Sequence, residues 1–153
     1  MVRLSDVVPA QRETLVSLDC PDMPPPDIQP ARPLQECRVA LISSAGLMQR
    51  GTDNIAGNFP GYRTITPDTS DANVLMNHLS VNFDRTGFAE DINCVFPRAQ
   101  LNALAAQNII GSAADNHYSF MGATPPDQMV DHVHQLTNEL NNQGVNTVCL
   151  LPV

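Results

Sequence analysis

The apolar positions of this chain form short continuous runs rather than strict alternation. Val39–Ile42 is the first such run and Val148–Leu151 is the last. Runs of this length are typical of strands that are buried on both faces of a parallel sheet. We therefore predict buried strands over residues 38–44 and 146–153.

A long amphipathic helix is predicted directly before the last strand, because four apolar residues recur there at helical spacing. Thr124 is expected to cap this helix, Pro125 to be its first residue and Gly144 to terminate it. The apolar stripe consists of Met129, Val133, Leu136 and Leu140.

The middle of the chain predicts further elements of both kinds. Residues 91–96 and 117–122 are expected to be short strands, and a helix is expected to begin at Pro97 and to close at Gly111. Residues 49–71 are rich in turn-forming residues and predict a long loop. Residues 62–65 suit a short strand within this loop, and residues 73–81 suit either a strand or a short helix.

Strands that alternate with helices predict an α/β fold: an open, mainly parallel, Rossmann-like sheet flanked by helices. Residues 1–36 are expected to precede it, with a short helix over 3–18 and then a proline-rich extended arm. The predicted organisation is an N-terminal arm (1–36) and an α/β domain (37–153).

Composition narrows the function classes. The net charge is −8, the pI is about 4.6, and all eight basic residues are Arg. An acidic chain without a basic cluster is poorly suited to bind phosphate backbones, so neither nucleic acid nor an anionic membrane is an expected partner. The chain also lacks a long apolar segment and a signal-peptide pattern, and a cytoplasmic location is expected.

The four cysteines show no metal-binding or redox spacing. Cys37, Cys94 and Cys149 lie in or beside apolar runs, and we expect them to pack as small hydrophobic residues. Cys20, between Asp19 and a proline, is expected to be exposed.

Two polar clusters could carry chemistry, since no nucleotide-binding loop or zinc-protease motif is present. The first contains His78, Asp84, Arg85 and Thr86: the histidine can exchange a proton and the arginine can bind a carboxylate. A structural Asp–Arg pair in a tight turn explains the same residues.

The second cluster contains His117, Tyr118 and Ser119, in which the first two are potential general acids. A strand end that buries both rings is the structural alternative. His132 and His134 lie off the apolar stripe of their helix and do not converge on one ligand, so no metal site is predicted.

Several blocks in order resemble the selenoprotein B family, the substrate-processing subunits of glycine, sarcosine, betaine and D-proline reductases. The resemblance covers essentially the whole chain and is closest to short, stand-alone members. It rests on residues 39–47, 78–88, 91–97 and 110–122, with Arg3-Leu4-Ser5-Asp6 at the start.

The resemblance implies an oxidoreductase that cleaves a carbon–heteroatom bond reductively in a small-molecule substrate, with electrons from a dithiol or thioredoxin-like donor. In the family, selenocysteine or cysteine directly follows the apolar-Pro-Val stretch that matches Val148–Val153, and it opens further βα structure. We therefore expect that the reading frame is cut at an in-frame UGA, that a C-terminal βα part is missing, and that this chain alone does not catalyse the reduction. No cofactor is expected besides selenocysteine beyond Val153.

The resemblance also suggests site roles. Arg85, Asp84, Thr86 and Ser119 would bind substrate, and His117, His78 and Tyr118 would act in catalysis, with His117 or His78 as proton donor. Two other interpretations stay open. One is a complete, non-catalytic domain that binds a small ligand or a partner protein through its sheet edge, where self-association is also expected. The other is a metal-assisted enzyme using His78, Asp84 and His117.

Overall fold

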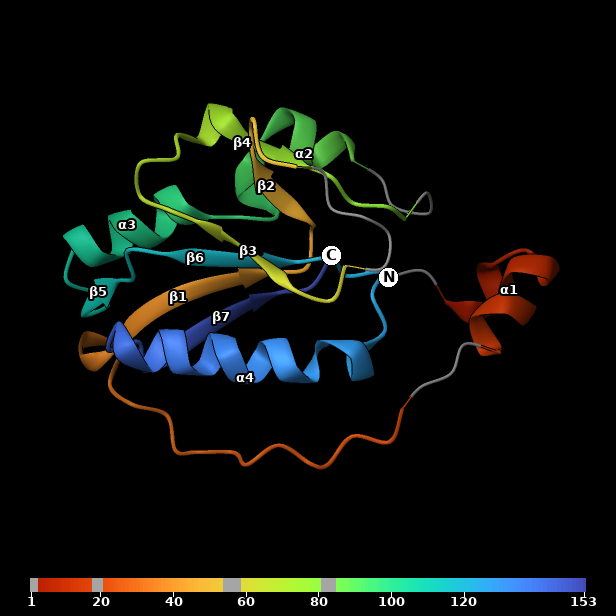
Figure 1. Ribbon diagram of the computed structural model, residues 1–153, viewed down its shortest axis with the longest axis horizontal. Helices are drawn as coiled ribbons and strands as arrows, with labels where there is room; N and C mark the ends of the chain where they lie inside the picture. The colour runs from red at the N-terminus through yellow and green to blue at the C-terminus, as the bar shows by residue number, and fades with distance from the viewer. Residues whose placement is uncertain (1–2, 18–20, 54–58, 81–84) are drawn as a thin grey trace.

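The predicted α/β architecture is confirmed by the computed structural model, which describes residues 3–17, 21–53, 59–80 and 85–153. Helices flank a mostly parallel sheet, with α3 (Arg98–Ala106) on one face and α4 (Pro126–Asn142) on the other (Figure 1). The strands of this sheet are β1 (Arg38–Ser43), β3 (Tyr62–Ile65), β5 (Ser112–Ala113), β6 (His117–Phe120) and β7 (Thr147–Leu151).

The strand β1 is the centre of the sheet. Along one edge it pairs in parallel with β7, from Val39 opposite Thr147 to Ser43 opposite Leu151. Two short strands share its other edge: β5 pairs with its beginning and β6 with its end, both in parallel. Strand β3 then adds to β6 in antiparallel orientation.

Burial of β1 on both faces explains its continuous apolar sequence. Val39 and Leu41 pack into the larger core with Phe96, whereas Ile42 packs beside Tyr118 under α4. Because successive side chains of a strand point to opposite faces, a central strand needs apolar residues at every position.

A second, two-stranded sheet was not predicted. Strand β2 (Leu47–Gln49) pairs in antiparallel orientation with β4 (Val74–Met76), which follows the 3-10 turn η3 (Asp71–Asn73). The chain turns at Gly46, which has a φ of 64°, and resumes an extended conformation directly after it. The ambiguous segment 73–81 therefore contributes a strand to this second sheet.

The strand predicted over residues 91–96 is wrong. The structure has a short helix α2 (Thr86–Glu90) and then a 3-10 turn η4 (Ile92–Cys94). The Asp91 side chain accepts a hydrogen bond from the backbone N–H of Asn93 (2.9 Å), and such a local bond favours a turn over a ladder.

Both predicted helix starts lie one residue too early. Helix α3 begins after Pro97, and it is followed by Asn108 with a φ of 55°, so the helix ends before the predicted Gly111. Helix α4 begins at Pro126, because a residue that precedes proline is pushed out of the helical region and Pro125 is extended there. Thr124 does not cap α4; its hydroxyl donates to the Phe59 carbonyl (3.1 Å).

The prediction of a buried final strand is also wrong. Among the described residues β7 pairs with β1 alone, so it is an edge strand, and Val148 and Leu150 are 42% and 67% exposed. Of the cysteines predicted to pack, Cys37 is buried, but Cys94 and Cys149 are exposed. Cys20 lies outside the described residues.

The N-terminal arm consists of η1 (Leu4–Asp6), α1 (Pro9–Val16), an extended proline-rich stretch and η2 (Leu34–Glu36). Helix α1 contains no buried residue and lies apart from the sheet in Figure 1. The division at residue 36 stays a prediction. No helix in the described ranges has the length and hydrophobicity needed to cross a membrane.

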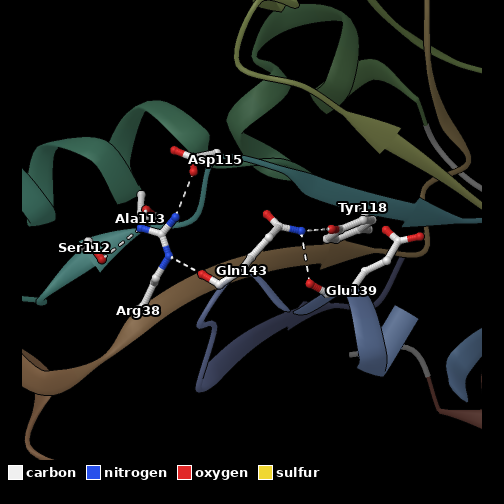
Figure 2. Close-up of polar contacts among 7 residues, drawn as sticks. All are labelled: Arg38, Ser112, Ala113, Asp115, Tyr118, Glu139 and Gln143. Carbon is white, nitrogen blue, oxygen red and sulfur yellow. Dashed lines mark hydrogen bonds and ion pairs between the residues drawn. The ribbon is translucent and has the colours of Figure 1, made fainter. Parts of the chain in front are cut away.

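A polar network around Arg38 ties the two edges of β1 together (Figure 2). The Arg38 guanidinium donates to the Gln143 carbonyl (2.9 Å) beyond α4, and to the Ala113 carbonyl (3.0 Å) of β5. It also pairs with Asp115 (2.9 Å). One side chain thus joins the end of α4 to the strand on the opposite side of β1.

Candidate functional site

Three parallel strands end at the same edge of the sheet. The backbone N–H of Ser44, just after β1, donates to the Leu151 carbonyl (3.1 Å), and that of Gly122, just after β6, donates to the Ser44 carbonyl (2.9 Å). The Ser44 hydroxyl accepts from the Val153 N–H (2.8 Å). In open α/β folds, ligands bind outside these carboxyl ends, so this carboxyl edge is the candidate functional site.

An apolar cavity of about 300 Å³ opens at the carboxyl edge, between the strand ends and the beginning of α4. The first turn of a long helix such as α4 favours negative charge, because its N–H groups lack partners within the helix. The cavity is lined mainly by Ile42, Phe120, Met129, Val133, Leu150 and Leu151, with Ser43, Ser44 and Gly122 at its polar side.

His78 lies at the same edge, beside the turn that leaves β1. Gly46 donates its N–H to the Phe120 carbonyl (2.9 Å) and accepts at its carbonyl from the Asn77 N–H (2.9 Å). A Cβ atom at Gly46 would come within 3.3 Å of the Cα of His78 and 2.9 Å of Met121 Cε. Glycine is therefore needed for this close approach, quite apart from its positive φ.

Arg85 holds the His78 loop in place. Its guanidinium donates to the carbonyl oxygens of His78 and Ser80, the latter at 3.1 Å. Burial, and secondly the nearby Arg85, lower the pKa of His78 below its usual value, so the ring is neutral at pH 7. Its Nδ1 accepts from the Ser80 N–H (3.1 Å), which leaves the ring proton on Nε2.

Tyr118 and Ser119, two of the predicted site residues, are fully buried and bonded to protein groups. The Tyr118 hydroxyl accepts from the Gln143 side chain beneath α4 (Figure 2), and burial raises the pKa of Tyr118. Ser119 accepts from the Leu47 N–H (2.8 Å) and donates to the Ser43 carbonyl (3.0 Å), which joins β6 to β1 and β2. Both residues have clear structural roles.

His117 lies elsewhere, on the α3 side of the sheet, where it packs edge-on against Phe96 and lines a polar cavity of about 450 Å³. The structure therefore does not bring His117 together with His78. His117 is the first residue of β6, whereas Gly46, which lies against His78, is bonded to Phe120 at the other end of that strand. Their predicted catalytic roles, and that of Tyr118, stay predictions.

The other predicted residues are dispersed. Thr86 is the exposed first residue of α2, and Asp84 lies outside the described residues. His132 and His134 lie on α4, and the described ranges contain no cluster of metal-ligating side chains. Sequence reasoning missed Ser44 and Gly122; the only signal was their position as the last residues of two predicted strands.

Comparison with known proteins supports a reductase relationship. The chain is 29% identical over 135 residues to D-proline reductase subunit gamma of Acetoanaerobium sticklandii. The match covers 85% of this chain and 54% of the relative, so the chain spans about half the length of that protein. No protein-family model matches the chain, and no solved structure matches it. The chain is thus a distant homologue of a reductase subunit.

Proposed function

We propose that this chain is the N-terminal portion of a selenoprotein B-type reductase subunit, which cleaves a C–N-type bond in a small amino-acid-like or amine substrate. The similarity to a D-proline reductase subunit supports the reaction class. The single structural observation that carries the proposal is the convergence of three strand ends, the α4 N-terminus and the His78 loop at the carboxyl edge.

The proposed nucleophile is the selenolate or thiolate that the family resemblance expects directly after Val153. Its position at the carboxyl end of β7, close to the first turn of α4, would favour the anionic form of selenium or sulfur. Overall, the C–N bond breaks, the carbon gains hydrogen and the nitrogen leaves as an amine. A dithiol supplies the two electrons and two protons and becomes a disulfide.

Arg85 is assigned to the substrate carboxylate, because a guanidinium binds carboxylates strongly and Arg85 is the basic residue beside His78. Its present partners are two backbone carbonyls, so it would exchange one of them for substrate. His78 is assigned to hydrogen-bond the leaving group from its Nε2–H.

The first test is the coding sequence after the Val153 codon, where a UGA or Cys codon followed by an open frame is expected. The protein from the whole frame, with Cys at that position, should then oxidise a dithiol only in the presence of D-proline, glycine, betaine or sarcosine. Arg85→Ala should raise the KM about tenfold, the loss of one charge-assisted bond. Arg50→Ala, an exposed arginine after β2, is the matched control.

Absence of dithiol oxidation with every one of these substrates would contradict the proposal. An unchanged KM in Arg85→Ala would contradict the role of that residue alone. The second candidate function is a non-catalytic domain that binds a small ligand or a protein, and the exposed apolar residues of β7 favour it. Substrate binding without any dithiol oxidation would support this second function.

A further inference from the structure

Strand β7 has one open edge. In the part of the chain that the structure describes, it pairs with β1 alone, and no strand lies along its other edge. The arm shares a cavity with Asn146 and Thr147 at the start of β7, but Val148 and Leu150 remain 42% and 67% exposed. An open edge of this kind is a template for pairing with a strand of another chain.

The pairing with β1 decides which backbone groups of β7 face the open edge. The Leu151 carbonyl accepts a hydrogen bond from the Ser44 N–H (3.1 Å), so the backbone groups of Leu151 point toward β1. Alternate residues of a strand direct these groups to the same side. Cys149 therefore also bonds toward β1, whereas the N–H and C=O groups of Val148 and Leu150 point to the open edge.

The sequence of β7 lacks the usual protection of an edge strand. Natural edges carry charged residues, a proline or a bulge that prevents pairing. Here no charged residue follows Glu139, and Pro152 comes only after the last residue of the strand. Two copies of a chain with a net charge of −8 repel each other, and the repulsion is least where neither copy carries charge.

The five residues of β7 are also complementary to a second copy of themselves. When two β7 strands run antiparallel about a two-fold axis at the central Cys149, Val148 of each copy lies opposite Leu150 of the other. These are the residues whose backbone groups face the edge, so each pair exchanges two hydrogen bonds. Their side chains lie on the α4 face, because their neighbours in β1, Ala40 and Ile42, pack there.

Helix α4 continues the apolar surface beside β7. Val130 and Val133 are 42% and 46% exposed, and Val133 lines the cavity at the carboxyl edge together with Leu150. None of the described residues that line this cavity is charged. In a two-fold dimer the two α4 helices lie on the same face of a continuous sheet, so the dimer would cover these valines as well.

We propose that the open edge of β7 is a homodimer interface. Two copies pair through β7 in antiparallel orientation about a two-fold axis at Cys149, and their sheets become continuous. The centre of the interface is Val148, Cys149 and Leu150 of each copy, with Val130 and Val133 beside it. This dimer does not depend on the reductase proposal.

Sedimentation of the full chain at increasing concentration measures the dimer, whose mass should be twice 16.6 kDa. Leu150→Lys places two like charges close to the axis and should weaken the dimer at least tenfold. Because Leu150 is largely exposed, the variant should fold. Ile109→Lys, at an exposed apolar position after α3, is the matched control and should leave the dimer unchanged.

The position of the axis can be tested by cross-linking. Opposite residues of an antiparallel pair that do not bond to each other have Cα atoms about 4.5 Å apart, which a disulfide can span. Diamide, which takes up the electrons and protons of two thiols, should therefore link two copies through Cys149. The linked dimer should disappear in Cys149→Ser and persist in Cys94→Ser, where the replaced cysteine is exposed as well.

Amide hydrogen exchange tests the register independently. In the dimer, the N–H groups of Val148 and Leu150 should exchange slowly, because each donates to the other copy. In Leu150→Lys the Val148 N–H should exchange fast, whereas the Cys149 N–H should stay protected by β1 in both proteins.

A chain that stays monomeric at millimolar concentration, or a dimer that survives Leu150→Lys, would overturn the proposal. Cross-linking that persists in Cys149→Ser would overturn it too, as would fast exchange of the Val148 and Leu150 N–H groups in the dimer. A monomer with fast exchange at both positions would leave β7 open to a strand of another protein. None of these results decides whether the proposed reduction occurs.

Discussion

Arg38→Met tests whether the Arg38 network holds the two edges of β1 together. Methionine keeps the apolar stem of the arginine but removes the guanidinium. The lost contacts are the bonds to the Gln143 and Ala113 carbonyls, a longer one to the Ser112 hydroxyl (3.3 Å) and the ion pair with Asp115. The side chain is 27% exposed, so these bonds are partly shielded from water.

The partial shielding of these bonds sets the expected loss of unfolding free energy in Arg38→Met. Each of the two carbonyl bonds is worth about 1 kcal/mol after discounting for partial exposure, and the exposed pair with Asp115 adds at most about 1 kcal/mol. The free energy of unfolding should therefore fall by about 2–3 kcal/mol. With a urea dependence of about 2 kcal/mol per molar, the midpoint should fall by about 1–1.5 M.

Urea unfolding followed by circular dichroism measures this shift, and Asp115→Asn is the matched control. Because Asp115 is 76% exposed, its variant should cost less than about 1 kcal/mol. The reasoning is refuted if Arg38→Met stays within about 0.5 kcal/mol of the parent protein, or if Asp115→Asn costs as much as Arg38→Met.

Two further predictions concern Gly111 and His117. Gly111→Ala places a Cβ 2.5 Å from the Gln35 carbonyl and should destabilise the protein by about 1–3 kcal/mol in urea unfolding. Gly87→Ala meets only ordinary contacts (3.6 Å) and should cost far less; equal losses would contradict the argument. The lowered pKa of His117, about 4, means that the unfolded chain binds a proton between pH 6.5 and 4 that the native state does not. The free energy of unfolding should therefore fall by roughly 3 kcal/mol as the pH is lowered from 6.5 to 4. In urea unfolding at a series of pH values, His117→Asn should lose less stability than the parent protein between pH 7 and 5.

The sheet and its two long helices could be predicted because their sequence signals are local. The apolar run of β1 and the stripe of α4 each reflect burial over many residues. The errors lie where one side chain or one proline outweighs the pattern: Asp91 converts an apolar run into a turn, and Pro126 delays the start of α4. The exposure of β7 depends on its place at the edge of the sheet. The apolar run in its sequence does not indicate which strands will lie beside it.

The candidate site was predictable only in part. His78 and Arg85 were singled out by residue type and lie together at the carboxyl edge. His117 was singled out for the same reason, yet its cavity depends on Arg98, Asp71 and Asp115, which converge from three separate segments. No sequence spacing indicates that convergence, because the three segments lie far apart in the sequence and meet only in the folded chain.

The central position of β1 has a consequence for folding during synthesis. Its nearest sheet partner, Ser112, is 74 residues further along the chain than Arg38, and Asn146 beside β7 is 108 residues further. At translation rates of about 5–20 residues per second, β1 stays without sheet partners for roughly 4–15 seconds after it is made. This unpaired apolar strand is where we expect a chaperone to bind the nascent chain.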